Sequence, residues 1–100
     1  MALQITNNAG ILEINGSLNA QNTLSLQNYF EALINQSSFI MLSLNNIIDM
    51  DKTAFQVIIS LYKKALSKNK VFYIIGKENQ KVMDLFETEK LNYLLKSNAA

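Results

Sequence analysis

The sequence predicts an α/β domain in which a four-stranded mixed β-sheet is packed with amphipathic helices. Two continuous apolar runs, residues 39–44 and 71–75, have the length and composition of strands that are covered on both faces. Around these runs, apolar residues recur every three or four positions, as they do in helices with one buried face. Strands that alternate with helices favour parallel pairing through right-handed crossovers.

The N-terminal third predicts a β-hairpin followed by a helix. Apolar positions within residues 3–5 and 11–14 indicate two short strands, and Asn7-Asn-Ala-Gly10 between them is typical of a turn because Asn and Gly tolerate positive φ. Gly16-Ser-Leu-Asn19 is expected to end the second strand. A helix over about residues 21–34 should then bury the side chains that share its apolar face, Leu26, Phe30 and Leu33.

The C-terminal half predicts one long helix, one strand and two shorter helices. The long helix is expected over residues 51–68, with Asn69 ending it, and Gly76 should end the strand at residues 71–75. Glu78 suits the start of the next helix, and residues 91–95 should form a last short helix. The residues expected to face the core are Ala54, Ile58, Leu61, Tyr62, Ala65, Val82, Leu85 and Phe86.

Length and composition limit the classes of protein that fit. One hundred residues suit a single domain (1–100, core about 3–95), and the absence of Cys excludes disulfides and thiolate metal sites. The absence of His removes the usual general base and metal ligand. The start of the chain does not resemble a signal peptide, and no apolar segment approaches the ~20 residues that span a membrane. We therefore expect a soluble cytoplasmic domain without membrane contact.

The charges are distributed unevenly along the chain. All nine lysines lie in residues 51–100, whereas residues 1–50 carry three acids and no lysine. Such an asymmetry can mark a nucleic-acid surface, but there is no arginine, which makes the commonest specific base contacts. Lys63, Lys64 and Lys68 fall in the last turns of a predicted helix, where cations oppose the negative end of the dipole. We therefore expect a solvated helix face and no nucleic-acid binding.

The start of the long helix is the most informative segment of the chain. Asp51 precedes the helix, and the Thr53 hydroxyl lies close to the positive end of its dipole, where backbone N–H groups lack intrahelical partners. A phosphate attached to Thr53 would be well accommodated there. The simpler explanation is that Asp and Thr cap the helix, since their side-chain oxygens satisfy those N–H groups. Both explanations remain open from these residues alone.

The order of elements, with the residues at their corners, resembles the STAS domain (sulfate transporter and anti-sigma factor antagonist). Gly16-Ser-Leu-Asn19 looks like the family's Gly-x-Leu-Asp corner, with Asn in place of Asp. Asp51-Lys-Thr-Ala54 falls where the family has Asp-Ser-Ser-Gly or close variants, after the apolar strand and its lead-in. Val71 to Gly76 matches the family's fourth strand, and Leu85-Phe86 with Leu91 falls on its closing Leu-Phe…Gly-Leu region.

This resemblance implies a regulatory module that binds an anti-sigma factor of the serine-kinase type. In the antagonist branch that kinase phosphorylates the second hydroxyl of Asp-Ser-Ser-Gly, and a PP2C-type phosphatase reverses the reaction. By position, Thr53 is the implied acceptor, Lys52 replaces the first hydroxyl and Ala54 replaces the glycine. Lys52 would either pair with a phosphate or oppose a kinase surface built for serine. The expected partner-binding residues are Asn19, Met50, Asp51, Lys52, Ala54 and Phe55.

The sequence supports other functional classes less well than this switch. Asp49 and Asp51 alone make a weak metal or acid–base site, and nothing supplies a nucleophile with an activating base, so we expect no catalytic residues, no metal, no cofactor and no enzyme. A constitutive adaptor subunit and a small-ligand sensor, with a pocket near Asn19 and Thr53, remain alternatives. Met50 and Phe55 either flank the partner site or lie in the core. The free chain is expected to be mostly monomeric.

Overall fold

The computed structural model describes residues 3–98 and contains six strands, three α-helices and one 3₁₀ helix within them. Along the chain, helices alternate with strands, as the sequence predicts for an α/β domain. In chain order the elements are β1 (Gln4–Asn8), β2 (Ile11–Leu18), α1 (Thr23–Gln36), β3 (Phe39–Ser43), β4 (Ile47–Met50), α2 (Lys52–Ser67), β5 (Val71–Ile75), α3 (Gln80–Thr88), η1 (Asn92–Leu94) and β6 (Leu95–Lys96).

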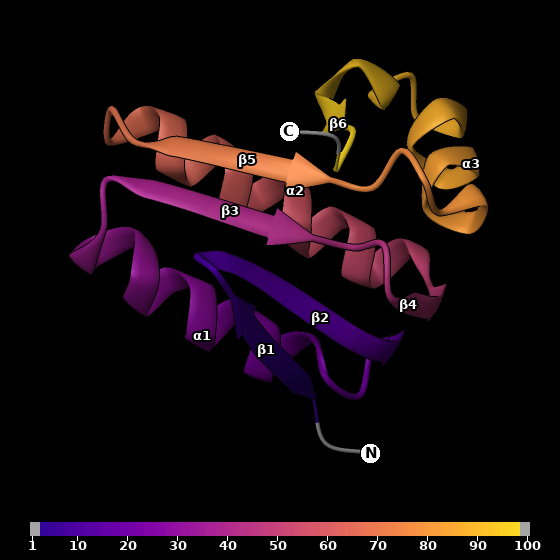
Figure 1. Ribbon diagram of the computed structural model, residues 1–100, viewed down its shortest axis with the longest axis horizontal. Coiled ribbons are helices and arrows are strands. Elements are labelled where there is room, and N and C mark those ends of the chain that lie inside the picture. Colours follow the sequence, from indigo (N-terminus) through magenta and orange to yellow (C-terminus); the bar gives the residue numbers. More distant parts are fainter. Residues whose placement is uncertain (1–2, 99–100) are drawn as a thin grey trace.

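The strands form one mixed sheet with the order β1-β2-β3-β5-β6, and β4 pairs with β2 beside this path (Figure 1). Among the described residues, only the β1–β2 hairpin is antiparallel, and every other pairing is parallel. The mixed sheet with parallel crossovers therefore confirms the predicted fold class. The number of strands does not agree, because the sequence analysis predicts four.

The two strands that the sequence analysis missed are the short ones. Residues 47–50, to which no strand was assigned, form β4, and β6 (residues 95–96) begins at Leu95, the last residue of the helix expected over residues 91–95. That helix is reduced to the single 3₁₀ turn at residues 92–94. Strands of two to four residues are too short to show an alternation of apolar and polar residues in the sequence. Their conformation is decided by the strands with which they pair.

β2 ends at Leu18, within the segment Gly16-Ser-Leu-Asn19 that was predicted to end it, but Gly16 itself lies inside the strand. The strand continues to Leu18, and Gly16 adopts φ +97° at a point where the pairing with β4 shifts register. This is a β-bulge, which needs a residue that tolerates positive φ. The bulge redirects the end of β2, which pairs there with β4 instead of β3.

The other two residues that were predicted to end a helix or a strand, Asn69 and Gly76, do so. Asn69 has φ +60° immediately after the C-cap of α2, and its N–H donates to Leu66 O at 3.0 Å, which ends the helix. Gly76 follows β5, and a Cβ atom at this position would lie 3.0 Å from Leu95 Cδ2 and 3.1 Å from Val82 Cγ1. Glycine at residue 76 therefore lets the start of α3 and β6 approach the end of β5 closely.

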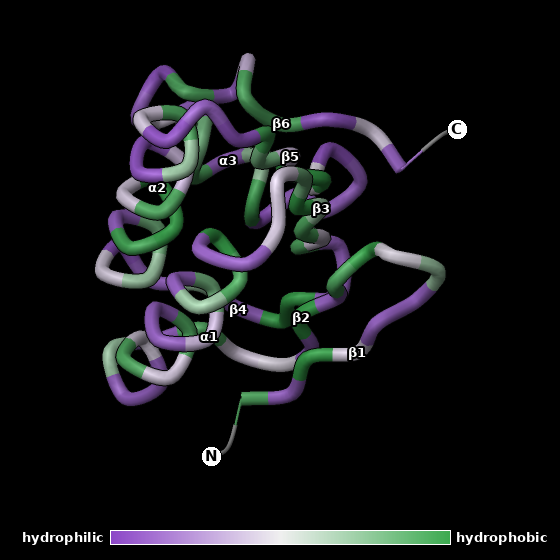
Figure 2. The backbone as a smooth tube through the Cα atoms, turned by 90° about the vertical axis from the view of Figure 1, so that its left-hand side faces the viewer, coloured by the Kyte–Doolittle hydropathy of each residue, from purple (hydrophilic) through white to green (hydrophobic). Residues whose placement is uncertain are grey.

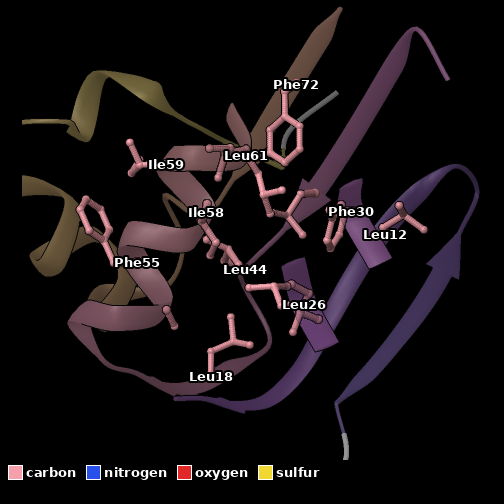
Figure 3. Close-up of a cluster of buried hydrophobic side chains, with 14 of the residues drawn as sticks. Leu12, Leu18, Leu26, Phe30, Leu44, Phe55, Ile58, Ile59, Leu61 and Phe72 are labelled. Carbon is pink, nitrogen blue, oxygen red and sulfur yellow. The ribbon is translucent and has the colours of Figure 1, made fainter. Parts of the chain in front are cut away.

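The helices gather on one side of the sheet, where the core lies (Figure 2). The residues predicted to face the core are buried or packed against it. Figure 3 shows Leu26, Phe30, Ile58 and Leu61 among the side chains that meet between helices and strands. Phe30 of α1 and Phe72 of β5 form an edge-to-face pair with ring centroids 6.1 Å apart. This layer of apolar side chains holds α1 and α2 against the sheet.

The opposite face of the sheet is not covered by a helix (Figure 2), which corrects the prediction that β3 and β5 are buried on both faces. Phe39 is 57% exposed, Val71 46% and Tyr73 36%. A continuous apolar run cannot reveal this, because it has the same sequence whether the second face is covered by its own chain or left open. Three large apolar side chains therefore face solvent on this side of the sheet.

Asn79 ties the start of α3 to the segment between β3 and β4. Its side-chain amide donates to the carbonyl oxygens of Leu44 (3.2 Å), Asn45 (3.2 Å) and Ile47 (2.8 Å), and its Oδ1 accepts from Val82 N. The two amide hydrogens of one side chain are thus shared among three backbone carbonyls, two in the loop and one at the start of β4, and the same side chain caps a helix. This network orders the loop that leads to β4.

Glu78, beside this network, should make the free energy of unfolding fall at acid pH. Its carboxylate accepts from Ser97 Oγ, Asn45 Nδ2 and Asn98 N, and the bonds from Ser97 and Asn45 are the main reason why the pKa of Glu78 lies below its ordinary 4.5. A lowered pKa contributes stability above the unfolded-state value, and this stability is lost as pH falls through the folded value. We expect Glu78→Gln to reduce the free energy of unfolding at pH 7, and the gap from the parent to narrow below about pH 4. Urea titrations at both pH values test this, with Glu87→Gln as control.

Candidate functional site

Asp51 caps α2 and ties the helix to a second loop. Its Oδ1 accepts from Ala54 N at 2.9 Å, which is an N-cap bond to the first turn. Its Oδ2 accepts from Ala20 N at 3.1 Å, and its own N–H donates to Leu18 O at 3.0 Å. One carboxylate therefore joins the start of α2 to the corner that follows β2.

The corner itself is organised by a pair of asparagines. Asn19 Oδ1 accepts from Gln21 N at 2.9 Å, and Asn19 N donates to Asn22 Oδ1 at 3.0 Å. Asn22 is buried and donates from Nδ2 to Ser17 O at 2.8 Å, although the sequence analysis did not single it out. The structure thus brings the two predicted corners, at Asn19 and Asp51, next to each other through Ala20.

Thr53 lies in the first turn of α2 with its side chain exposed. Among the described residues 3–98, no group bonds to its hydroxyl, because the capping role belongs to Asp51. The capping explanation is therefore confirmed for Asp51 and wrong for Thr53. The hydroxyl remains accessible at the positive end of a 16-residue helix.

Lys52 points toward α3. Its Nζ lies 3.7 Å from Glu89 Oε2, and the Lys52 side chain is 64% exposed. An exposed ion pair at this distance contributes at most about 1 kcal/mol, so the ammonium can leave Glu89 for a stronger anion. Lys52 is thus the nearest lysine in sequence to Thr53, and in this structure it is held only loosely.

Two of the residues expected to contact a partner have buried side chains. Ala54 is fully buried, and Phe55 (Figure 3) is 3% exposed. The Phe55 ring packs edge-to-face on Phe86 with 4.9 Å between the ring centroids. For Phe55 the core alternative is therefore correct, because the helix turns this position inward. Met50 is partly buried and packs against the core. Exposed contacts around Thr53 must come from other side chains.

Ile48 is the apolar surface residue that the sequence analysis missed. It is 66% exposed in β4, whereas its neighbour Ile47 is buried. Alternation along a strand places these two residues on opposite faces, and the prediction failed because β4 was not recognised as a strand. Leu24, in the first turn of α1, is 67% exposed. An exposed large apolar residue thus lies close in sequence to each of the two joined corners.

A pocket of about 250 Å³ lies beside Thr53 on the surface of α1 and α2. Most of the residues that line it have polar side chains, namely Gln27 from α1 and Thr53, Gln56 and Ser60 from α2, and Val57 completes the wall. No group of three or more acidic, His or Cys side chains within residues 3–98 converges as metal ligands would. In the same part of the chain, no helix combines the length and the apolar composition that crossing a membrane requires.

Replacing Asp51 should weaken the joint between the two corners. Asp51→Ala removes the N-cap bond to Ala54 and the bond to Ala20, and we expect the free energy of unfolding to fall by about 1–2 kcal/mol. Asp49→Ala is the matched control, because Asp49 is exposed and its side chain bonds only to the next N–H in the chain. Urea denaturation of both variants measures the difference. If the free energy of unfolding fell equally in both variants, the hydrogen bonds of Asp51 would not stabilise the fold.

Comparison with known proteins gives one family and several structural relatives. The STAS domain family model matches residues 1–96. The unphosphorylated anti-sigma factor antagonist SpoIIAA superposes with a TM-score of 0.80 at 12% identity over 98% of this chain and 89% of that chain. The phosphorylated form of SpoIIAA from Bacillus gives 0.71 at 12% identity over 98% and 92%.

A third structural relative comes from a signalling complex. It is a chain from the complex of the diguanylate cyclase SiaD with its activator SiaC from Pseudomonas aeruginosa, with a TM-score of 0.63 at 14% identity. The alignment covers 96% of this chain and 90% of that chain. A search of curated protein sequences found no match.

Proposed function

Because the chain belongs to the STAS domain family, we propose that it is a cytoplasmic, non-enzymatic regulatory module that binds a partner protein around the start of α2 and is switched by phosphorylation of Thr53. The proposed partner is an anti-sigma factor of the serine-kinase type, and a PP2C-type phosphatase would reverse the modification. The relatives with this fold include the anti-sigma factor antagonist SpoIIAA, which has been solved in phosphorylated and unphosphorylated forms.

The observation that carries the proposal is the free hydroxyl of Thr53. A kinase needs an acceptor whose oxygen can reach the γ-phosphate, and Thr53 is exposed with no bonded partner in the described chain. Asp51 performs the capping that would otherwise occupy a hydroxyl at the helix start. Modification of Thr53 would therefore break no hydrogen bond on which the fold depends.

The surroundings of Thr53 fit a phosphate better than those of an average surface hydroxyl. The dipole of a 16-residue helix is positive at this end, and the first backbone N–H groups have no intrahelical acceptor. Lys52 can exchange its loose contact with Glu89 for a phosphate oxygen. Asp51 opposes the added charge, but both of its carboxylate oxygens already accept hydrogen bonds. We therefore expect the phosphorylated chain to remain folded.

The replacement of the family's glycine by Ala54 does not obstruct a partner. Ala54 is fully buried, so its Cβ points into the core and lies outside the path of an approaching protein. The exposed contacts that we propose are Thr53, Lys52 and Ile48, with Asn19 and Met50 at the edge of the same surface. Phe55 supports this surface from below and does not take part in the contact.

A constitutive adaptor without phosphorylation is the second candidate. It is favoured by Lys52, which stands where the family has a first hydroxyl and lies against Glu89 in this structure. The complex of SiaD with its activator SiaC also contains a chain with this fold, and that complex pairs a cyclase with its activator. A small-ligand sensor would use the polar pocket beside Thr53. In either case the same surface binds, but Thr53 carries no phosphate.

Capture of the tagged chain from its native cells separates these candidates. The switch predicts a kinase-type protein among the captured partners and a fraction of chain with phosphate on Thr53 in mass spectrometry. The same capture with Thr53→Ala should keep the partner and lose the phosphopeptide. A captured partner with no phosphate on Thr53 in any growth condition would reject the switch and favour the adaptor.

A further inference from the structure

The face of the sheet that no helix covers carries a compact group of apolar side chains, and Ser97 and Asn98 line a hollow on this face together with Ile75, which is buried. We call Ile11, Phe39, Met41, Val71 and Tyr73 the open-face cluster. Phe39 and Val71 are direct neighbours across β3 and β5, as are Met41 and Tyr73, and Ile11 is the neighbour of Met41 across β2 and β3. Neighbours in register share a face of the sheet, so these five side chains form one continuous patch.

Two unpaired charges of opposite sign flank this cluster. Glu13 on β2, Ser43 on β3, Ile75 on β5 and Lys96 on β6 are successive neighbours in register, so they form one row across the sheet. Glu13 and Lys96 stand at the two ends of this row, each one strand outside the β3–β5 pair. Lys96 also lines a hollow together with Val71 and Tyr73. Within residues 3–98, neither charge has an ion-pair partner.

We infer that this face binds a second copy of the same chain in a symmetric, face-to-face dimer. A two-fold axis parallel to the strands and midway between β3 and β5 exchanges these two strands between the copies. It places Phe39 over Val71 of the second copy and Met41 over Tyr73. Two sheets that pack in this way lie about 10 Å apart with their side chains between them.

The same axis pairs the flanking charges. Because Glu13 and Lys96 lie at equal distances from the axis in one row, each Glu13 faces Lys96 of the other copy, twice per dimer. A self-complementary patch is what a two-fold interface requires. This matching of acid with base about the centre of the cluster favours a second copy over an unrelated partner. The surface shares no residue with the proposed switch and goes beyond that function.

The dimer should be weak. The open-face cluster contributes five side chains, whereas a standard interface has roughly 20–30 residues a side. We therefore expect a chain that is monomeric at about 5 μM, in line with the sequence-based expectation, and substantially dimeric at several hundred micromolar.

Charge reversal with sedimentation equilibrium tests the inference, over concentrations from about 5 μM to about 1 mM. Glu13→Lys and Lys96→Glu should each raise the dissociation constant at least about tenfold, because like charges then face each other twice. An equimolar mixture of the two single variants should recover the dimer, since both contacts are again between opposite charges. Phe39→Ser, at an exposed position, should also weaken the dimer without unfolding the chain.

Two control variants carry the same charge changes away from this face. Glu87→Lys and Lys81→Glu lie at exposed positions of α3 and should dimerise as the parent does. Circular dichroism verifies that each variant is folded. A parent chain that stays monomeric up to the highest concentration would overturn the inference and leave the face to a different protein. A dimer that tolerates Glu13→Lys, with no gain on mixing, would overturn it as well.

Discussion

Phe55→Ala is expected to lower the free energy of unfolding by about 3–5 kcal/mol, the range seen when a buried aromatic side chain is cut back to alanine. Phe55 is 3% exposed, and its ring packs edge-to-face on Phe86, which joins α2 to α3. Removing the ring leaves a cavity between the two helices that the rigid sheet cannot fill. Urea denaturation at neutral pH measures the loss.

Met50→Ala is the matched control for this effect. Met50 lies five residues earlier and is only partly buried, so its truncation should cost clearly less than that of Phe55. If both variants stay fully stable and only partner binding falls, then Phe55 does not behave as the core residue that its burial indicates. A large loss for Phe55 and a small one for Met50 would support the division between core and surface at the start of α2.

Thr53→Asp is expected to weaken the complex with the kinase-type partner about a hundredfold while the chain unfolds at nearly the parent temperature. A carboxylate that is buried against a partner without matched donors costs a few kcal/mol, which is the origin of the expected loss. The fold should tolerate the change, because the Thr53 side chain is exposed, bonds to none of the described residues 3–98 and lies where the helix dipole favours negative charge. Calorimetric titration of the captured partner measures the affinity, and a thermal melt measures the stability.

Two further variants distinguish the effect of a negative charge at position 53 from the effect of losing the threonine side chain. Thr53→Ala should bind as the parent does and melt at nearly the same temperature, since the cap is supplied by Asp51. Ser67→Asp adds the same charge at the other end of α2, far along the helix from the site, and should leave the affinity unchanged. A Thr53→Ala variant that is strongly destabilised would show that the hydroxyl has a structural role after all.

The helices and the long strands could be predicted from the sequence because their own residues encode them. Period-three-to-four spacing located the buried faces of α1, α2 and α3, and Asn69 marked the end of α2 through the positive φ that it adopts. The β4 and β6 strands could not be predicted in this way. They contain four and two residues, and β2 and β5 fix their conformation from outside.

The candidate site could be predicted in outline but not in its division of roles. Asp-x-Thr at a helix start fits two arrangements, in which either side chain is the cap, and only the bond from Ala54 N to Asp51 assigns the role. The burial of Phe55 follows from which face of α2 meets α3, which is a tertiary property. The exposed face of β3 and β5 could not be predicted for the same reason, because a sequence does not state which surfaces its own chain covers. The exposure of Ile48 could not be predicted because β4 was not recognised as a strand.

The affinity of the Thr53-phosphorylated chain for its kinase-type partner tests the central claim most directly. Chain with phosphothreonine at position 53 and unmodified chain should be titrated into the same partner preparation under identical salt. The account predicts binding that is weaker by about a hundredfold or more for the phosphorylated chain, since a phosphate carries more charge than the aspartate mimic. Equal affinities of the two forms would contradict the switch and leave a constitutive adaptor as the function of this surface.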